Sequence, residues 1–161
     1  RELVGQLRYP DFFLATGAGF GLVPVAPGTV GCLWGIPLAM AVNHLPGVVW
    51  QVVAIVVLAA IGVPICTRAA HRIGRKDPGA VVWDEIASLP MTFFLIPATE
   101  MWSPWMLVAG FALHRLFDIS KPPPAPQLER LKDGLGIMAD DWSAGVYSCL
   151  CLHLLRWMGV V

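Results

Sequence analysis

Paired carboxylates are the residues of this sequence best suited to chemistry. Asp84–Glu85 and Asp140–Asp141 are adjacent pairs, and Asp118 stands alone between them. Neighbouring carboxylates repel one another and resist ionisation unless a cation joins them. Without cysteines or ligand-spaced histidines beside them, they suit a hard cation, and Mg²⁺ binds carboxylate oxygens while it retains water and bridges to phosphate. We therefore expect a Mg²⁺ site among these five carboxylates.

Basic and hydroxyl side chains accompany the carboxylates. Arg115 and Lys121 flank Asp118 and supply the positive charge that a phosphoryl group needs. Thr29 follows a Pro-Gly pair at the start of an apolar run, where a helix N-terminus would present free backbone N–H groups. Together these residues predict a site that holds a divalent cation and a phosphate group.

Most of these residues also have purely structural explanations. Thr29, Asp84 and Asp141 are good N-cap residues, and we expect each of them to open a helix. Arg115 and Lys121 suit a helix C-terminus or the polar edge of a membrane. Capping requires only one carboxylate at each helix start, so the adjacent pairs favour the functional interpretation.

The elements that must position these residues are apolar helices. Hydrophobic residues make up 57% of the 161 residues and charged residues only 14%, whereas soluble domains carry about 25% charged residues. Residues 12–67 contain no Lys, Arg, Asp or Glu, and within them residues 48–67 form a run of twenty, long enough to span the roughly 30 Å of a hydrocarbon core. We expect an all-α, polytopic membrane bundle that forms a single domain over residues 1–161.

The apolar runs predict about five helices, at residues 30–42, 48–67, 85–97, 104–117 and 142–161. Several are shorter than the roughly twenty residues of a free-standing span. Basic residues gather in the loops after the second and fourth helices, which places these loops and the N-terminus in the cytoplasm. All the candidate site residues then lie at cytoplasmic helix ends.

Several classes of protein are excluded or disfavoured by composition. Eleven basic and eleven acidic residues leave no positive excess for nucleic acid. The four cysteines, which form no CxxC pair, argue against zinc and a disulfide framework. The glycines of "TGAGFG" (16–21) lack the spacing of a dinucleotide-binding loop.

Four segments together resemble one known family. The segments "APGTVG" (26–31), "WDE" (83–85), "HRLFDISKPPP" (114–124) and "GIMADDWSAGVY" (136–147) occur in the order and spacing of the phosphatidylglycerophosphatase A family. The resemblance runs from Phe12 to Tyr147, nearly the whole chain. It implies an all-helical, Mg²⁺-dependent phosphatase of the bacterial inner membrane, which removes the terminal phosphate of phosphatidylglycerophosphate to leave phosphatidylglycerol.

The resemblance also implies roles for individual residues. The expected catalytic residues are Asp141, Glu85, Arg115 and Lys121, with Asp141 or Glu85 as the general base. The expected phosphate ligands are Thr29, Arg115 and Lys121, and the expected metal ligands are Asp84, Glu85, Asp118, Asp140 and Asp141. The partners are the phospholipid substrate and the bilayer, with the site on the cytoplasmic side; no protein partner is implied.

The chain departs from the family pattern at uncharged positions. Cys32 stands where serine is common, Ser88 lies where glutamine is often nearby, and Pro123 replaces a frequent tryptophan. No charged position is lost, so we expect activity to be retained. We also expect the fourth helix to stop at Asp118, with the prolines of residues 122–124 holding the next loop extended.

Three other functions compete with a phosphatase. A CDP-alcohol phosphotransferase also gathers aspartates at a membrane face, but "KDGLGIMADD" (132–141) lacks its DG-x2-AR segment. An ion transporter would place its carboxylates near the bilayer midplane, whereas these lie at predicted helix ends. A scaffold would leave the carboxylate pairs unexplained.

Overall fold

The computed structural model describes residues 2–161 and contains helices but no strand over that range. The prediction of an all-α fold is confirmed. The long helices are α3 (Pro27–Asn43), α4 (Val48–Ile73), α6 (Pro104–Ser120) and α8 (Asp133–Trp157), and the shorter elements are α1 (Glu2–Gln6), α2 (Pro10–Ala15), η1 (Phe20–Leu22), α5 (Trp83–Thr92), η2 (Glu100–Trp102) and α7 (Ala125–Leu128).

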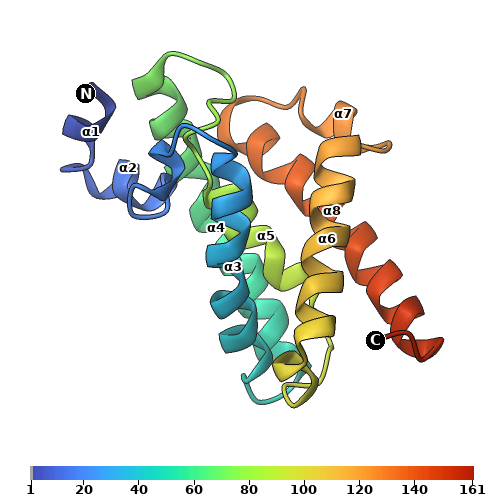
Figure 1. Ribbon diagram of the computed structural model, residues 1–161. Coiled ribbons are helices and arrows are strands. Elements are labelled where there is room, and N and C mark those ends of the chain that lie inside the picture. The colour runs from blue at the N-terminus through green and yellow to red at the C-terminus, as the bar shows by residue number, and fades with distance from the viewer. Residues whose placement is uncertain (1) are drawn as a thin grey trace.

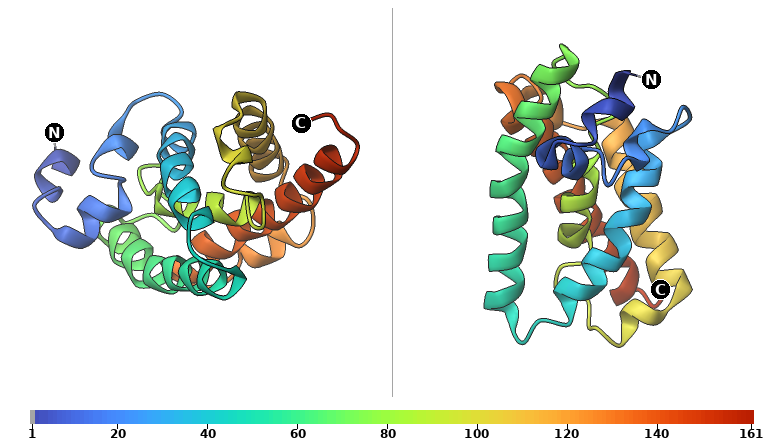
Figure 2. Two further views of the ribbon diagram at one scale, coloured as in Figure 1. Left: turned by 90° about the horizontal axis from the view of Figure 1, so that it is seen from below. Right: turned by 90° about the vertical axis from the view of Figure 1, so that its left-hand side faces the viewer.

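Helix α5 lies at the centre of the bundle and packs against α3, α4, α6 and α8 (Figure 2). It is only 10 residues long, and most of its side chains are buried because it has neighbours on all sides. The turn at 44–47 and the connection at 93–103 lie at one end of the bundle, while the loops 74–82 and 121–132 lie at the other (Figure 1). The acidic start of α5 points toward this second end.

Membrane character is concentrated in α4. Within residues 2–161 it is the one helix that is both long and apolar enough to cross a membrane. Many of its apolar side chains face outward, among them Val49, Val53, Val56 and Ile61. The prediction of a polytopic bundle with about five spans is therefore not confirmed by helix length and hydropathy.

Two helices continue beyond their predicted ends. Helix α4 runs to Ile73, past the predicted end at Thr67, and stops at Gly74, which adopts the left-handed conformation typical of a helix C-terminus. The apolar run ends at Thr67, whereas the helix continues to Ile73. Helix α6 continues to Ser120, so the prediction that it stops at Asp118 is wrong; Lys121, with φ of 43°, ends it.

The predicted helix starts also differ from the structure. Val82 and Ala26 occupy the N-cap positions of α5 and α3, so neither Asp84 nor Thr29 caps its helix. Helix α8 begins at Asp133, about two and a half turns before the predicted start at residue 142. Asp140 and Asp141 consequently lie inside α8, away from its N-terminus.

Glycine permits the close crossing of α4 and α8 that brings the α8 carboxylates inward. A Cβ atom at Gly134 would lie 2.1 Å from the Val63 backbone oxygen of α4, far inside contact distance. The Gly134 N–H instead donates a hydrogen bond to Thr67 Oγ1 at 3.0 Å. The start of α8 is thereby fixed against α4.

Candidate active site

Three carboxylates converge between α5 and α8. Asp84 and Glu85 lie in the first turn of α5, and Asp141 reaches toward them from α8; one oxygen of each lies within 4.8 Å of those of the other two. The helices approach closely because a Cβ atom at Gly145 of α8 would already lie 3.0 Å from the backbone oxygen of Ser88 on α5. This is a cation-sized arrangement of oxygen ligands.

The hydrogen bonding of these three carboxylates is incomplete. Asp84 Oδ1, Glu85 Oε2 and Asp141 Oδ2 are all buried, and none of them has a hydrogen-bond partner within residues 2–161. Leaving buried polar atoms unpaired costs free energy, so such groups normally have a partner. A divalent cation bound among the three would supply one, and their chemistry fits Mg²⁺.

Burial and mutual repulsion perturb all three groups. Burial raises the pKa of Asp84 and of Asp141 well above the ordinary value, and the nearby Glu85 carboxylate raises both further. Burial raises the pKa of Glu85 from 4.5 to about 7, against the lowering effect of a hydrogen bond with Asp84. Without a cation, the cluster therefore holds protons close to neutral pH.

The other two predicted metal ligands have basic partners. Arg115 Nη1 donates a hydrogen bond to Asp118, whose charge also contributes to the raised pKa of Asp141. Lys121 Nζ lies 2.7 Å from Asp140 Oδ2. The adjacent aspartates of α8 thus face different surroundings: Asp141 joins the three-carboxylate cluster, and Asp140 holds Lys121.

The start of α3 borders the cluster at Gly28. A Cβ atom at this glycine would lie 2.2 Å from Glu85 Oε1 and 3.3 Å from Arg115 Nη1, so a carboxylate and a guanidinium lie against the same backbone segment. The first backbone N–H groups of α3 have no acceptor within the helix. Thr29 is the next residue and is half-buried; its contact with a phosphate stays a prediction.

Two neighbours of the site escaped sequence analysis. Glu129, which follows α7, forms a second ion pair with Lys121 at 3.0 Å, and no motif or spacing in the sequence marked it. Gly28 was noticed only as part of a helix start, although its missing side chain is what admits Glu85. The roles assigned to the individual acidic and basic residues stay predictions.

The arrangement can hold a divalent cation and a phosphate group together. Three buried carboxylates offer oxygen ligands, and the Arg115 guanidinium lies beside them at the α3 N-terminus. Lys121 adds a second positive charge at the same end of the bundle. Cation, guanidinium and helix N-terminus are the elements that enzymes use to stabilise a transferring phosphoryl group.

Comparison with known proteins relates the chain to one family, and two relatives carry the name of that family. Residues 13–156 match the family Phosphatidylglycerophosphatase A. The chain is 38% identical to the phosphatidylglycerophosphatase A of Escherichia coli over 93% of its own length and 86% of that protein, and 36% identical to that of Haemophilus influenzae over 95% and 93%.

A further relative carries a different name. A protein of Bacteroides thetaiotaomicron, named as a candidate phosphatidylinositol-3-phosphatase, is 34% identical over 94% of this chain and 99% of its own length. No solved structure matches the chain. The family match covers most of the sequence and includes every residue of the carboxylate cluster. The chain therefore belongs to the phosphatidylglycerophosphatase A family and is a phosphatase.

Proposed function

We propose that this protein hydrolyses the terminal phosphomonoester of phosphatidylglycerophosphate, giving phosphatidylglycerol and inorganic phosphate in bacterial glycerophospholipid synthesis. The observation that carries the proposal is the buried cluster of Asp84, Glu85 and Asp141, each with an unpaired carboxylate oxygen, whose Glu85 carboxylate lies against the same backbone segment as Arg115. Two relatives that match almost the whole chain are named for this activity.

Mg²⁺ is the cation that we propose for the cluster. Asp84, Glu85 and Asp141 would hold it. Asp118 and Asp140 stay proposed ligands, available once their basic partners Arg115 and Lys121 turn to the substrate. When bound, the ion supplies positive charge that makes the phosphorus more electrophilic and a water molecule more acidic.

Glu85 is the better placed of the two candidate general bases. Its Oε1 lies against Gly28, on the side of the cluster where Arg115 also lies, whereas Asp141 lies between α5 and α8. Glu85 would accept a proton from the attacking water as the water oxygen bonds to phosphorus and the bond between phosphorus and the leaving glycerol oxygen breaks. The leaving oxygen takes up a proton and becomes the free hydroxyl of phosphatidylglycerol.

Arg115, Lys121 and the start of α3 would bind the phosphate. The Arg115 side chain already lies beside Gly28, so phosphate oxygens placed there would meet both the guanidinium and the free N–H groups of α3. Lys121 would exchange its contact with Asp140 or Glu129 for one with the phosphate. These contacts orient the phosphorus and stabilise charge on its oxygens.

We further propose that the bundle is embedded in the bacterial inner membrane as a multi-pass protein. Most of the exposed tryptophans gather at the end of the bundle opposite the carboxylates, at the starts of α4 and α6 and the end of α8 (Figure 1); they are Trp50, Trp102, Trp105 and Trp157, whereas Trp34 lies within α3. Tryptophan is enriched at membrane interfaces. Basic residues near the end of α4 support an orientation with the catalytic end in the cytoplasm.

The experiment is phosphate release from phosphatidylglycerophosphate in detergent micelles, with Mg²⁺ and then with EDTA. Asp141→Asn removes one cluster carboxylate and should abolish release while the protein stays folded. Asp133→Asn is the matched control on the same helix, because Asp133 is half-exposed and contacts only His71 among the basic residues of 2–161. Its activity should equal that of the wild type.

The outcomes separate this proposal from its alternatives. Release that requires Mg²⁺ and is lost in Asp141→Asn supports it. A folded wild type that releases no phosphate with Mg²⁺ present refutes it. Phosphatidylinositol 3-phosphate is assayed in parallel because of the Bacteroides relative, and faster release from that lipid would replace the substrate in the proposal.

A further inference from the structure

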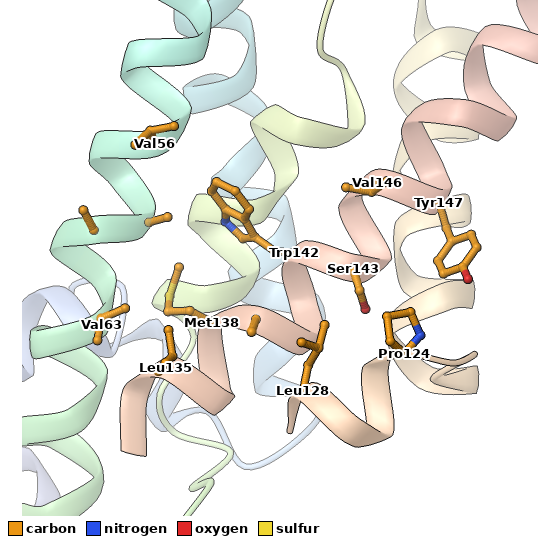
Figure 3. A pocket seen from close by; sticks show the side chains of 13 residues that line it. Val56, Val63, Pro124, Leu128, Leu135, Met138, Trp142, Ser143, Val146 and Tyr147 are labelled. Atoms are coloured by element: carbon orange, nitrogen blue, oxygen red, sulfur yellow. The ribbon is translucent and has the colours of Figure 1, made fainter. Parts of the chain in front are cut away.

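An apolar groove runs along the outside of the bundle between α4 and α8, with α7 and Pro124 closing one side (Figure 3). Its volume is about 820 Å³, within the range of pockets that enclose small ligands. The walls are almost entirely hydrocarbon, and side chains that line it include Val56, Val63, Leu128, Leu135, Met138 and Val146. Such a groove offers an occupant contact surface but very few hydrogen bonds.

The shape of the groove suits an extended hydrocarbon chain. Along α8 it reaches from Leu135 to Tyr147, a distance of about 18 Å at the rise of an α-helix. One leaflet of a bilayer has a hydrocarbon depth of about 15 Å. The wall opposite α8 is α4, the helix that is long and apolar enough to cross a membrane, so the groove lies where a lipid chain would run.

The inner wall of the groove touches the element that carries the carboxylates. Met138 forms this wall, and Gly62 of α4 lies against it: a Cβ atom at Gly62 would lie 2.5 Å from Met138 Sδ and 2.8 Å from Trp83 Cδ1. Trp83 directly precedes Asp84 in α5. The inner wall of the groove thus packs in the same hydrophobic cluster as Trp83, in the first turn of the helix that carries Asp84 and Glu85.

The polar side chains of the groove connect it to the proposed phosphate site. Ser143 Oγ donates a hydrogen bond to the backbone oxygen of Asp140 at 2.6 Å, and the Asp140 side chain holds Lys121. The Tyr147 hydroxyl donates to the backbone oxygen of Pro123 at 2.5 Å, in the loop that follows Lys121. These hydrogen bonds therefore connect one edge of the groove to Lys121 and its loop, and Lys121 is the lysine that would bind phosphate.

We propose that this groove binds one acyl chain of the phospholipid substrate while its phosphate lies at the carboxylate cluster, an inference that rests on the proposed function. The named relatives support a site for this part of the lipid. Two are named for phosphatidylglycerophosphate and one for a phosphatidylinositol phosphate; these lipids differ in the headgroup and share the diacylglycerol portion. The groove recognises the shared portion.

The groove orients the bound lipid and contributes little hydrophobic binding energy. A chain that leaves the bilayer for the groove exchanges one hydrocarbon environment for another, so little free energy is released. A chain held along α8 instead restricts how the glycerol backbone and the phosphate can lie, and correct placement of the reacting atoms accounts for a large part of catalysis. Blocking the groove should therefore impair turnover of long-chain lipids selectively.

The test fills the groove from a position remote from the carboxylates. Ala60 lines the groove from α4 and is exposed, and Ile61 beside it is exposed on another face; Ala60→Phe and Ile61→Phe thus introduce the same ring inside and outside the groove. Val146→Phe and Leu150→Phe form a second pair on α8. Each variant is assayed on the dipalmitoyl and the dihexanoyl forms of phosphatidylglycerophosphate in the same detergent.

We expect Ala60→Phe and Val146→Phe to lower kcat/KM for the dipalmitoyl lipid by about tenfold or more. The value for the dihexanoyl lipid, whose chains are too short to fill the groove, should stay within twofold of the wild type. Ile61→Phe and Leu150→Phe should leave both values unchanged. Equal losses on both lipids, or equal behaviour of a groove variant and its control, would overturn the proposal.

A second measurement does not depend on turnover. A phospholipid that carries a photoreactive diazirine in the distal half of one acyl chain is bound to wild type and to Ala60→Phe, and the crosslinked peptides are mapped. Labelling of the α4 and α8 groove residues that Ala60→Phe suppresses supports the inference; labelling spread over the outer faces of α4 and α6 refutes it. A wild type that is labelled in the groove but releases no phosphate would contradict only the proposed function.

Discussion

Asp140 and Asp141 show how adjacent residues take different positions in one site. Successive residues of an α-helix point about 100° apart, so when Asp141 faces α5 its neighbour faces the loop after α6, where Lys121 lies. From the sequence alone, both are expected to be metal ligands together with the other carboxylates. Only the rotational setting of α8 against α5 separates the cluster member from the ion-pair partner.

Gly28 provides a test of the site at the scale of a single atom. In Gly28→Ala the new methyl group would lie 2.2 Å from Glu85 Oε1, so the carboxylate must move, and we expect kcat/KM to fall about 100-fold because reacting groups are displaced. Alanine favours a helix more than glycine does, so the melting temperature should not fall in parallel.

The control for this substitution is Gly79→Ala. A Cβ atom at Gly79 would meet only Pro27 Cγ at 3.9 Å, an ordinary contact, and phosphatase activity should be unchanged. An active Gly28→Ala enzyme would show that the position of Glu85 against α3 is not required for hydrolysis.

The carboxylate cluster should also make stability depend on pH and Mg²⁺ together. The pKa of Glu85 is raised from 4.5 to about 7, so between these pH values the folded protein binds more protons than the unfolded chain. The free energy of unfolding in EDTA should therefore fall as pH rises through this window. Because Mg²⁺ binds the ionised carboxylates, it should raise the melting temperature more above pH 7 than below pH 5.

The measurement is a melting curve across this pH range, with EDTA and with Mg²⁺. Asp141→Asn should weaken both the pH dependence and the effect of Mg²⁺, whereas Asp133→Asn should not. If Asp141→Asn and wild type respond alike to pH and to Mg²⁺, the cluster does not bind the ion.

At the scale of elements, α8 was the helix that the sequence predicted least well. Its first two turns contain Gly134 and Gly136, which ordinarily weaken a helix, and they precede the apolar run at 142–161 from which the helix is predicted. In the structure both glycines meet backbone: a Cβ atom at Gly136 would lie 2.6 Å from the Leu131 oxygen. Tertiary contacts thus override local propensity, and a single sequence does not reveal which glycines serve packing.

Helix-scale packing predicts different costs for two glycine substitutions at the α4–α8 crossing. In Gly134→Ala the methyl group would meet the Val63 backbone oxygen at 2.1 Å, and overpacking against backbone should cost about 1–3 kcal/mol. In Gly62→Ala it would meet Met138 Sδ at 2.5 Å and Trp83 Cδ1 at 2.8 Å; both are side-chain atoms, and the flexible thioether can move aside where backbone cannot. Chemical denaturation in detergent should show the larger loss for Gly134→Ala; equal losses would mean that α4 and α8 shift freely.

At the scale of the whole molecule, the helical class and the order of the long helices followed from apolar runs and their punctuation. Residues 44–47, with a proline and a glycine, form the turn between α3 and α4 as expected. The composition of the cluster did not follow, because it depends on α5 lying between four helices, and no local pattern encodes that central position.

The proposed placement in the membrane predicts opposite accessibility of the two ends of the bundle. His44 lies in the turn after α3, and Arg130 follows α7 at the catalytic end (Figure 1). In intact spheroplasts, a membrane-impermeant maleimide should label His44→Cys and should label Arg130→Cys only after permeabilisation. The wild type, which carries only the native cysteines, is the control. Labelling of Arg130→Cys in intact spheroplasts would contradict the cytoplasmic site.

The shortness of α3 and α6 has a consequence for the surrounding lipid. Each has 17 residues, which gives about 25 Å of helix, less than the roughly 30 Å of a typical hydrocarbon core. In the proposed placement this hydrophobic mismatch compresses the bilayer around the α3–α6 side, while α4, with 26 residues, matches it with length to spare. The bilayer would therefore be locally thinner around the enzyme, and the headgroups of nearby lipids would lie closer to the buried carboxylates.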